Sequence, residues 1–316
     1  MSGKANMMIE PCPLRYRDVR GYRMCARHGR AGLPSLTLGG IMVPKARSLR
    51  QLTRSALIAC AVIEWAVLSW SWASGAGSRV LDLTYPFDET TQVWPSNPPF
   101  HRDSMQRGGT ATEDWYATGE VALSEHAGTH MDAPIHFAQG QAGIDGIPVE
   151  HLMGPAVVID VRAAAAVDRD YRLSISDVHR WEASHGTIPP GAIVMMLTGW
   201  GTYWKDRERY FGSATPDVPT TLHFPGFSKE VAELLVSQRH ISGIGIDTPS
   251  IDYGPSQDFV VHRIVNAAGL YGLENVAGLE EVPLSGATLV ALPMKIAGGT
   301  GAPVRIIALL PSPAAQ

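Results

Sequence analysis

The chain has 316 residues, of which 45% are hydrophobic and 18% charged, and its formal net charge is −4. A chain of this size can bury a sizeable core in one or two domains, and its weak acidic charge without a basic stripe argues against a nucleic-acid partner. Its three cysteines are Cys12, Cys25 and Cys60, so no disulfide, thiol ligand or thiol nucleophile is expected in the rest of the chain.

The first 76 residues are predicted to lie outside the folded domain. Residues 1–41 carry scattered arginines without periodicity, so they are expected to be disordered or untranslated. Residues 42–76 run from basic to apolar (55–73) to small residues, the order of a secretory signal peptide with a cut after Ala76. This order predicts export to the periplasm or the medium, without stable membrane insertion after cleavage. Glu64 interrupts the apolar run, so an uncleaved anchor and a cytoplasmic product remain alternatives.

Residues 77–316 are predicted to form a single domain of the α/β or mixed α+β class, rich in loops because of the 32 glycines and 23 prolines. Apolar runs predict strands over residues 79–83, 156–161, 192–197, 241–246, 289–293 and 304–310. Helices are expected over residues 174–184, 229–238 and 260–269. Ser174 and Ser228 are good N-terminal caps, and Gly269 is a good stop.

A cluster of potential metal ligands lies between these elements, with all members at even positions: His126, His130, Asp132 and His136. Imidazole and carboxylate groups are ligands of Zn²⁺ and Mn²⁺. Gly128 and Pro134 argue against a helix here, and four strand residues span about 13 Å, too far for the first two histidines to share an ion comfortably. We therefore expect the segment to bend at Gly128.

Residues 126–137 read H-x-G-T-H-x-D-x-P-x-H-F, which resembles the signature of the cyclase family of metal-dependent hydrolases. That family includes bacterial kynurenine formamidase and isatin hydrolase. The resemblance extends over residues 78–311 and implies the family's swivelling β/β/α fold, with a mixed sheet and flanking helices. On the same ground the protein is expected to be a homodimer or a homotetramer.

The family also has a histidine followed twelve residues later by Glu-Asn, both contributing to a second metal position. Here His262, Glu274 and Asn275 show that spacing. The resemblance therefore implies that Asp132 bridges two ions, with His126 and His130 on one and His262 and Glu274 on the other. Because some relatives work with a single metal, the expected cofactor is Zn²⁺ or Mn²⁺, one or two per chain.

The implied reaction is hydrolysis of a small aromatic amide, either an aryl formamide or a cyclic amide, by metal-activated water. The family motif gives His136 the role of general acid and base, which suits an imidazole near neutral pH. A Trp-Pro pair lies near the substrate in the family, so Trp94 is a candidate aromatic wall. Trp115 and Tyr116 are weaker candidates of the same kind.

Two alternatives to this function stay open: a single-metal lactam hydrolase of the isatin type, and a non-catalytic exported protein that binds a metal or a small aromatic ligand. A serine hydrolase is not supported, because the sequence has no G-x-S-x-G motif. The aromatic segment 200–211 could cover the substrate, contact another subunit or be an anchored surface loop. Asp247, after a predicted strand, is expected to cap a turn rather than bind a ligand.

Overall fold

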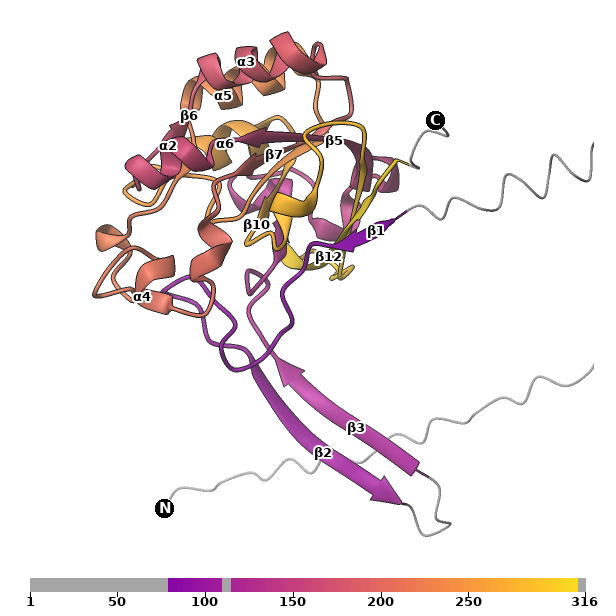
Figure 1. The fold of residues 1–316 in the computed structure, drawn as a ribbon. Helices are drawn as coiled ribbons and strands as arrows, with labels where there is room; N and C mark the ends of the chain where they lie inside the picture. The colour runs from indigo at the N-terminus through magenta and orange to yellow at the C-terminus, as the bar shows by residue number, and fades with distance from the viewer. Residues whose placement is uncertain (1–78, 110–114, 312–316) are drawn as a thin grey trace, which may run out of the picture. The chain divides into compact units, whose positions relative to one another are not determined.

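The computed structural model describes residues 79–109 and 115–311, so the predicted extension 1–41 and signal peptide 42–76 lie outside the described residues. Its centre is a mixed sheet in the order β1-β12-β11-β5-β7-β9-β10-β4 (Figure 1). These strands are β1 (Val80–Asp82), β4 (His130–Asp132), β5 (Met153–Asp160), β7 (Ile193–Leu197), β9 (Gly243–Ile246), β10 (Tyr271–Glu274), β11 (Thr288–Pro293) and β12 (Gly301–Leu309). Because β12 also pairs with β4, the strands from β12 to β4 close into a barrel-like ring.

Three neighbouring strands of the ring are parallel to one another and are buried on both faces of the sheet. β5, β7 and β9 run parallel, and every residue of β7 is buried. Val158 and Met195 point into the core inside the ring, whereas Val157 and Val194 belong to a second core on the other face. Burial on both faces requires continuous rather than alternating apolar runs, which is why these strands were recognisable in the sequence.

Three helices cover the outer face of the parallel strands: α3 (Ile175–His185), α5 (Lys229–Leu234) and α6 (Val260–Ala267) (Figure 1). Trp181, Val231 and Val265 supply one side chain from each helix to the second core. Ser174 forms a capping box with Asp177, and the Ser228 hydroxyl accepts a hydrogen bond from the amide of Val231. The three predicted helices and the mixed α/β architecture are therefore confirmed. The predicted helix 229–238 continues beyond α5 as a π-helical turn, Leu235–Arg239.

The remaining elements are short or lie outside the ring. α2 (Arg162–Val167) and α4 (Arg207–Tyr210) are brief helices, and β6 (Arg172–Leu173) pairs with β8 (Gly226–Phe227). Within the described part of the chain, no helix is both long and apolar enough to span a membrane.

A hairpin of β2 (His101–Gly109) and β3 (Trp115–Ala122) forms a separate two-stranded sheet (Figure 1). Every residue of β3 is exposed, and the side chains of Trp115 and Tyr116 are 75% and 49% exposed. No strand was predicted from the sequence here, because β3 buries none of its residues and so carries no buried apolar face. The prediction that Trp115 and Tyr116 could line the substrate site is wrong, since neither residue lines the cavity described below.

Candidate active site

The chain bends within the histidine motif as expected, because Gly128 adopts a φ of 58°. A side chain does not fit there without strain, since a Cβ atom would also approach the Phe87 ring to 2.7 Å. After the bend, β4 lies between β10 and β12, with Asp132 opposite Gly272 on one strand and Gly301 on the other. A Cβ atom on Gly301 would come within 2.6 Å of the His126 ring, so this glycine leaves the space that the histidine fills.

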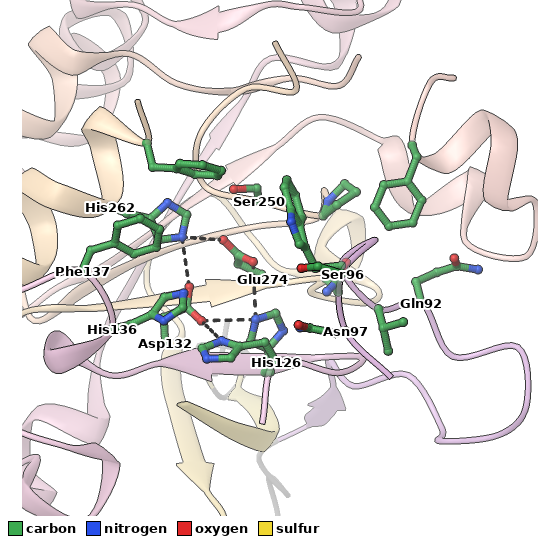
Figure 2. Close-up of a pocket in the computed structure, with 17 residues that line it drawn as sticks. Gln92, Ser96, Asn97, His126, Asp132, His136, Phe137, Ser250, His262 and Glu274 are labelled. Atoms are coloured by element: carbon green, nitrogen blue, oxygen red, sulfur yellow. Dashed lines mark hydrogen bonds and ion pairs between the residues drawn. The ribbon is translucent and has the colours of Figure 1, made fainter. Parts of the chain in front are cut away.

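The six predicted site residues come together from distant parts of the chain, and Figure 2 shows His126, Asp132, His136, His262 and Glu274 of this group side by side. His130 and Asp132 lie on β4, and Glu274 is the cross-strand neighbour of His130 on β10. His262 comes from α6, and the 3₁₀ turn Pro134–His136 directs His136 back over His126, where the two rings stack at 4.0 Å. The structure therefore brings together residues that are up to 148 positions apart in the sequence.

Asp132 is the centre of this cluster. Its Oδ1 lies 2.6 Å from Nδ1 of His126 and 3.3 Å from Nε2 of His130, and its Oδ2 lies 3.1 Å from Nε2 of His262. The Glu274 carboxylate lies 3.1 Å from Nε2 of His262 and 3.4 Å from Nε2 of His130. A carboxylate with both oxygens engaged in this way is suited to bridge two ions.

The donor atoms form two groups that share Asp132. One group is His126, Asp132 and His136, the other is His130, Asp132 and Glu274, and within each the donor atoms lie within 4.8 Å of one another. The predicted division, with His126 and His130 on one ion and His262 and Glu274 on the other, is a different partition of the same cluster. The role of each residue as a ligand stays a prediction.

The chemistry of the cluster fits a divalent cation. Asp132 and Glu274 are buried, and every ion-pair partner of theirs in the described chain is a histidine. Burial raises the pKa of Asp132, but the neighbouring His126 and His130 outweigh it and hold that pKa well below its ordinary value. Burial lowers the pKa of His130, but Asp132 and Glu274 raise it overall to about 9. Buried carboxylates that depend on positive charge, with no thiolate nearby, suit Zn²⁺ or Mn²⁺.

Further hydrogen bonds orient these donors. Nδ1 of His262 lies 2.7 Å from Asp252, whose carboxylate also accepts the amides of Val261 and His262 at the start of α6. The amide of Ile251 donates to Glu274 over 2.9 Å. Asp252 was not among the site residues predicted from the sequence. Its only signal was its place in the loop after β9, where α/β sheets tend to carry functional residues.

The cluster forms the floor of a cavity of about 200 Å³ with aromatic walls (Figure 2). Trp94, Phe137, Phe211 and Phe259 line it together with polar residues such as Ser96 and Asn97, and none of its lining residues in the described chain is a lysine or an arginine. The Trp94 ring meets Phe259 edge-on at 6.0 Å. Trp94 therefore lies where an aromatic wall was predicted, and its contact with substrate stays a prediction.

The aromatic segment 200–211 is anchored by its aromatic side chains, while Lys205 and Glu208 between them are exposed. Trp200, Trp204, Tyr210 and Phe211 are buried and form one cluster with Leu222 and Phe224. Of the aromatic side chains in the segment, only Phe211 reaches the cavity. Asp247 accepts hydrogen bonds from the amides of Thr198 and Gly199 and from the Thr198 hydroxyl, which supports its predicted structural role.

His136 is the site residue whose environment favours a neutral ring. Burial lowers its pKa to about 4, and this effect outweighs the opposing influence of Asp132. A neutral imidazole at the edge of the cluster can accept a proton and return it.

Comparison with known proteins agrees with the fold and indicates a class of activity. The family model Cyclase matches residues 81–253. Isatin hydrolase from Roseibium aggregatum is 36% identical over 205 residues, covering 62% of this chain and 76% of the relative. Kynurenine formamidase from Polaromonas naphthalenivorans is 29% identical, covering 72% of this chain and 90% of the relative. The solved structure of isatin hydrolase A from Labrenzia aggregata, bound to benzyl benzoate, superposes with a TM-score of 0.68 at 32% identity, covering 78% of this chain and 99% of that one.

The fold and the site thus define a metal-dependent hydrolase that acts on carbon–nitrogen bonds other than peptide bonds. The chain belongs to the cyclase family.

Proposed function

We propose that this protein hydrolyses the carbon–nitrogen bond of a small aromatic amide, either an aryl formamide such as N-formylkynurenine or a lactam such as isatin. The observation that carries the proposal is the buried histidine and carboxylate cluster at the floor of an aromatic-walled cavity, with His136 stacked beside it. The names of the two relatives, isatin hydrolase and kynurenine formamidase, support the same substrate class.

When bound, a divalent cation lowers the pKa of water towards about 7 and polarises a carbonyl oxygen. The chain's own residues supply the rest of the chemistry. Trp94, Phe137 and Phe259 offer ring faces and edges that hold a planar substrate with its carbonyl towards the floor. The His136 ring accepts the proton lost by the attacking water and delivers it to the leaving amine nitrogen. A neutral amine then leaves in place of an unstable amide anion.

Two cations per chain, Zn²⁺ or Mn²⁺, are the loading that we propose. Asp132 belongs to both groups of donor atoms, and His262 and Glu274 supply donors beyond those that a single ion needs. His126, His130, Asp132, His262 and Glu274 are the residues that would hold the two ions.

Metal analysis of the purified chain, coupled to assays on N-formylkynurenine and isatin, tests these proposals. We expect close to two ions per chain, turnover of at least one substrate, loss of turnover on chelation and recovery when Zn²⁺ or Mn²⁺ is returned. One ion per chain with turnover of isatin alone would favour the single-metal lactam hydrolase. Tight metal binding without turnover of either substrate would favour the non-catalytic binding protein.

We propose further that the hairpin β2–β3 joins two copies of this chain into a dimer, on its own or within a tetramer. An isolated two-stranded hairpin is marginally stable in water, and this one exposes Trp115, Tyr116 and Val121. Sedimentation velocity of the double variant Trp115→Ser and Val121→Ser should show monomers where the wild type dimerises. Val167→Ser on α2 is the control, because Val167 is 90% exposed but lies outside the hairpin. A monomeric wild type would refute the proposal.

Export is proposed from residues 42–76 alone. Fractionation of expressing cells, with N-terminal sequencing of the product, should find a chain that begins at Gly77 outside the cytoplasm. A cytoplasmic product that retains residue 42 would contradict export.

A further inference from the structure

The aromatic segment 200–211 is connected to the metal site by a buried chain of hydrogen bonds. The Tyr210 hydroxyl donates to Oδ1 of Asn275 over 2.7 Å, and Nδ2 of Asn275 donates to the Gly128 carbonyl over 2.7 Å. The same carbonyl lies 3.0 Å from Nδ1 of His130. Tyr210 and Asn275 are both buried, and burial raises the pKa of Tyr210 well above its ordinary value, so the hydroxyl keeps its proton.

Each link in this chain has a defined direction. A carbonyl oxygen can only accept, so Nδ1 of His130 must carry a proton, and Nε2, which faces Asp132 and Glu274, is the ring nitrogen left to bind a cation. The Asn275 amide must also direct its NH₂ group to the Gly128 carbonyl, because the reverse orientation would oppose two acceptors. The Oδ1 atom then faces Tyr210 and accepts the hydroxyl proton.

The Gly128 carbonyl needs such a restraint. Glycine is the least restricted residue, and Gly128 lies at a φ of 58°, in the bend that separates His126 from His130. If the peptide after Gly128 rotated, His130 would lose the acceptor that fixes its tautomer. Asn275 is well placed to prevent this, since its own backbone is held by the Thr129 hydroxyl and the Thr248 carbonyl.

We propose that Tyr210 and Asn275 are positioning residues of the metal centre. Together they clamp the Gly128 carbonyl, and the clamp keeps His130 in the tautomer whose Nε2 can bind a cation. This inference rests on the proposed function insofar as His130 is a ligand. It also gives the aromatic segment 200–211 a role, which is to hold Tyr210 inside the cluster formed with Trp204 and Phe211.

The test is the affinity of the full chain for Zn²⁺ and Mn²⁺, measured by competition with a chromophoric chelator. Tyr210→Phe should weaken binding about 10-fold, the lower end of the range for groups that orient metal ligands. Tyr271→Phe is the matched control, because Tyr271 is equally buried but its hydroxyl donates to the His151 carbonyl, outside the site. Tyr271→Phe should lower the free energy of unfolding about as much as Tyr210→Phe does, but it should bind Zn²⁺ and Mn²⁺ with the affinity of the wild type.

Asn275→Gly provides a second, independent variant, since glycine accepts the left-handed backbone of this position (φ 56°) and removes only the amide. It should weaken metal binding at least as much as Tyr210→Phe, and the double variant should bind like Asn275→Gly alone. Equal affinities in Tyr210→Phe and Tyr271→Phe, or additive losses in the double variant, would overturn the clamp while the proposed function stands. A wild type that binds neither cation would overturn both.

Discussion

Asp252 and His136 contact the metal-ligand cluster from different sides, so substitutions at these two residues are expected to change different properties of the protein. Asp252 does not line the cavity. Its carboxylate oxygens accept hydrogen bonds from the His262 ring and from the amides of the first turn of α6. His136 lines the cavity and stacks on His126. A change at Asp252 should therefore alter cation binding, and a change at His136 should alter turnover.

For His136→Ala we expect turnover to fall about 10²- to 10⁴-fold, the usual contribution of a positioned acid and base, with the metal content unchanged. Parallel assays and metal analysis measure both quantities. His185→Ala is the control, because His185 is also a stacked histidine but lies on α3 against Trp181. Loss of bound metal in His136→Ala would instead make this residue a ligand.

For Asp252→Asn we expect the affinity for Zn²⁺ or Mn²⁺ to fall about 10- to 100-fold, because the variant no longer fixes His262 as the Nδ1–H tautomer. Chelator competition measures the change. Asp170→Asn is a matched control, since Asp170 pairs with Nδ1 of His223 over 2.8 Å outside the site. Wild-type affinity in Asp252→Asn would remove this residue from the metal centre.

At the scale of elements, the sequence predicted what depends on local pattern. The apolar runs of β5 and β7, the capping box of α3 and the bend at Gly128 were all recognisable. β4 and β10 were not, because their sequences, His-Met-Asp and Tyr-Gly-Leu-Glu, contain polar residues and a glycine in place of an apolar run. The link between Tyr210 and Asn275 joins positions 65 apart and leaves no local signal at all.

The capping box of α3 should make stability depend on pH. Burial raises the pKa of Asp177, but hydrogen bonds from Ser174, Tyr171 and Arg180 outweigh it and lower the pKa below its ordinary value. The folded state then binds fewer protons than the unfolded state, so this stabilisation is fully present above the unfolded pKa of about 3.9 and is lost as the pH falls through the folded pKa.

Urea unfolding of wild type and Asp177→Asn at pH 7 and near pH 3 measures this dependence. The difference in free energy of unfolding should be largest at pH 7 and shrink in acid. Asp145→Asn, in a turn away from α3, provides a reference substitution of the same kind. A difference that does not change with pH would show that the Asp177 charge is not what stabilises the helix.

At the scale of the whole molecule, the proposed metal centre lies where the sheet closes into a ring. β4 completes the ring by pairing with β10 and β12, and it carries two of the predicted ligands. Cation binding should therefore stabilise the ring most strongly at β4.

Chelation should lower the melting temperature, since an ion at 100 times its Kd stabilises the folded state by about 2.7 kcal/mol. Hydrogen exchange should accelerate first at the paired residues Met131 and Leu273. Val158 and Met195, paired in the middle of the sheet, provide the internal reference and should change least. Uniform acceleration across the sheet would contradict a local effect at β4.

The two glycines opposite Asp132 also limit how this kind of enzyme can diversify. Gly272 and Gly301 face that aspartate from both neighbouring strands, and a methyl group on Gly301 would collide with His126. Few amino-acid substitutions are therefore expected to be tolerated at the base of the cavity. Trp94, Ser96 and Asn97 lie on a loop outside the ring, where exchange of one side chain does not disturb strand pairing. New substrates are consequently expected to be acquired by replacing residues of that loop, over an unchanged set of ligands.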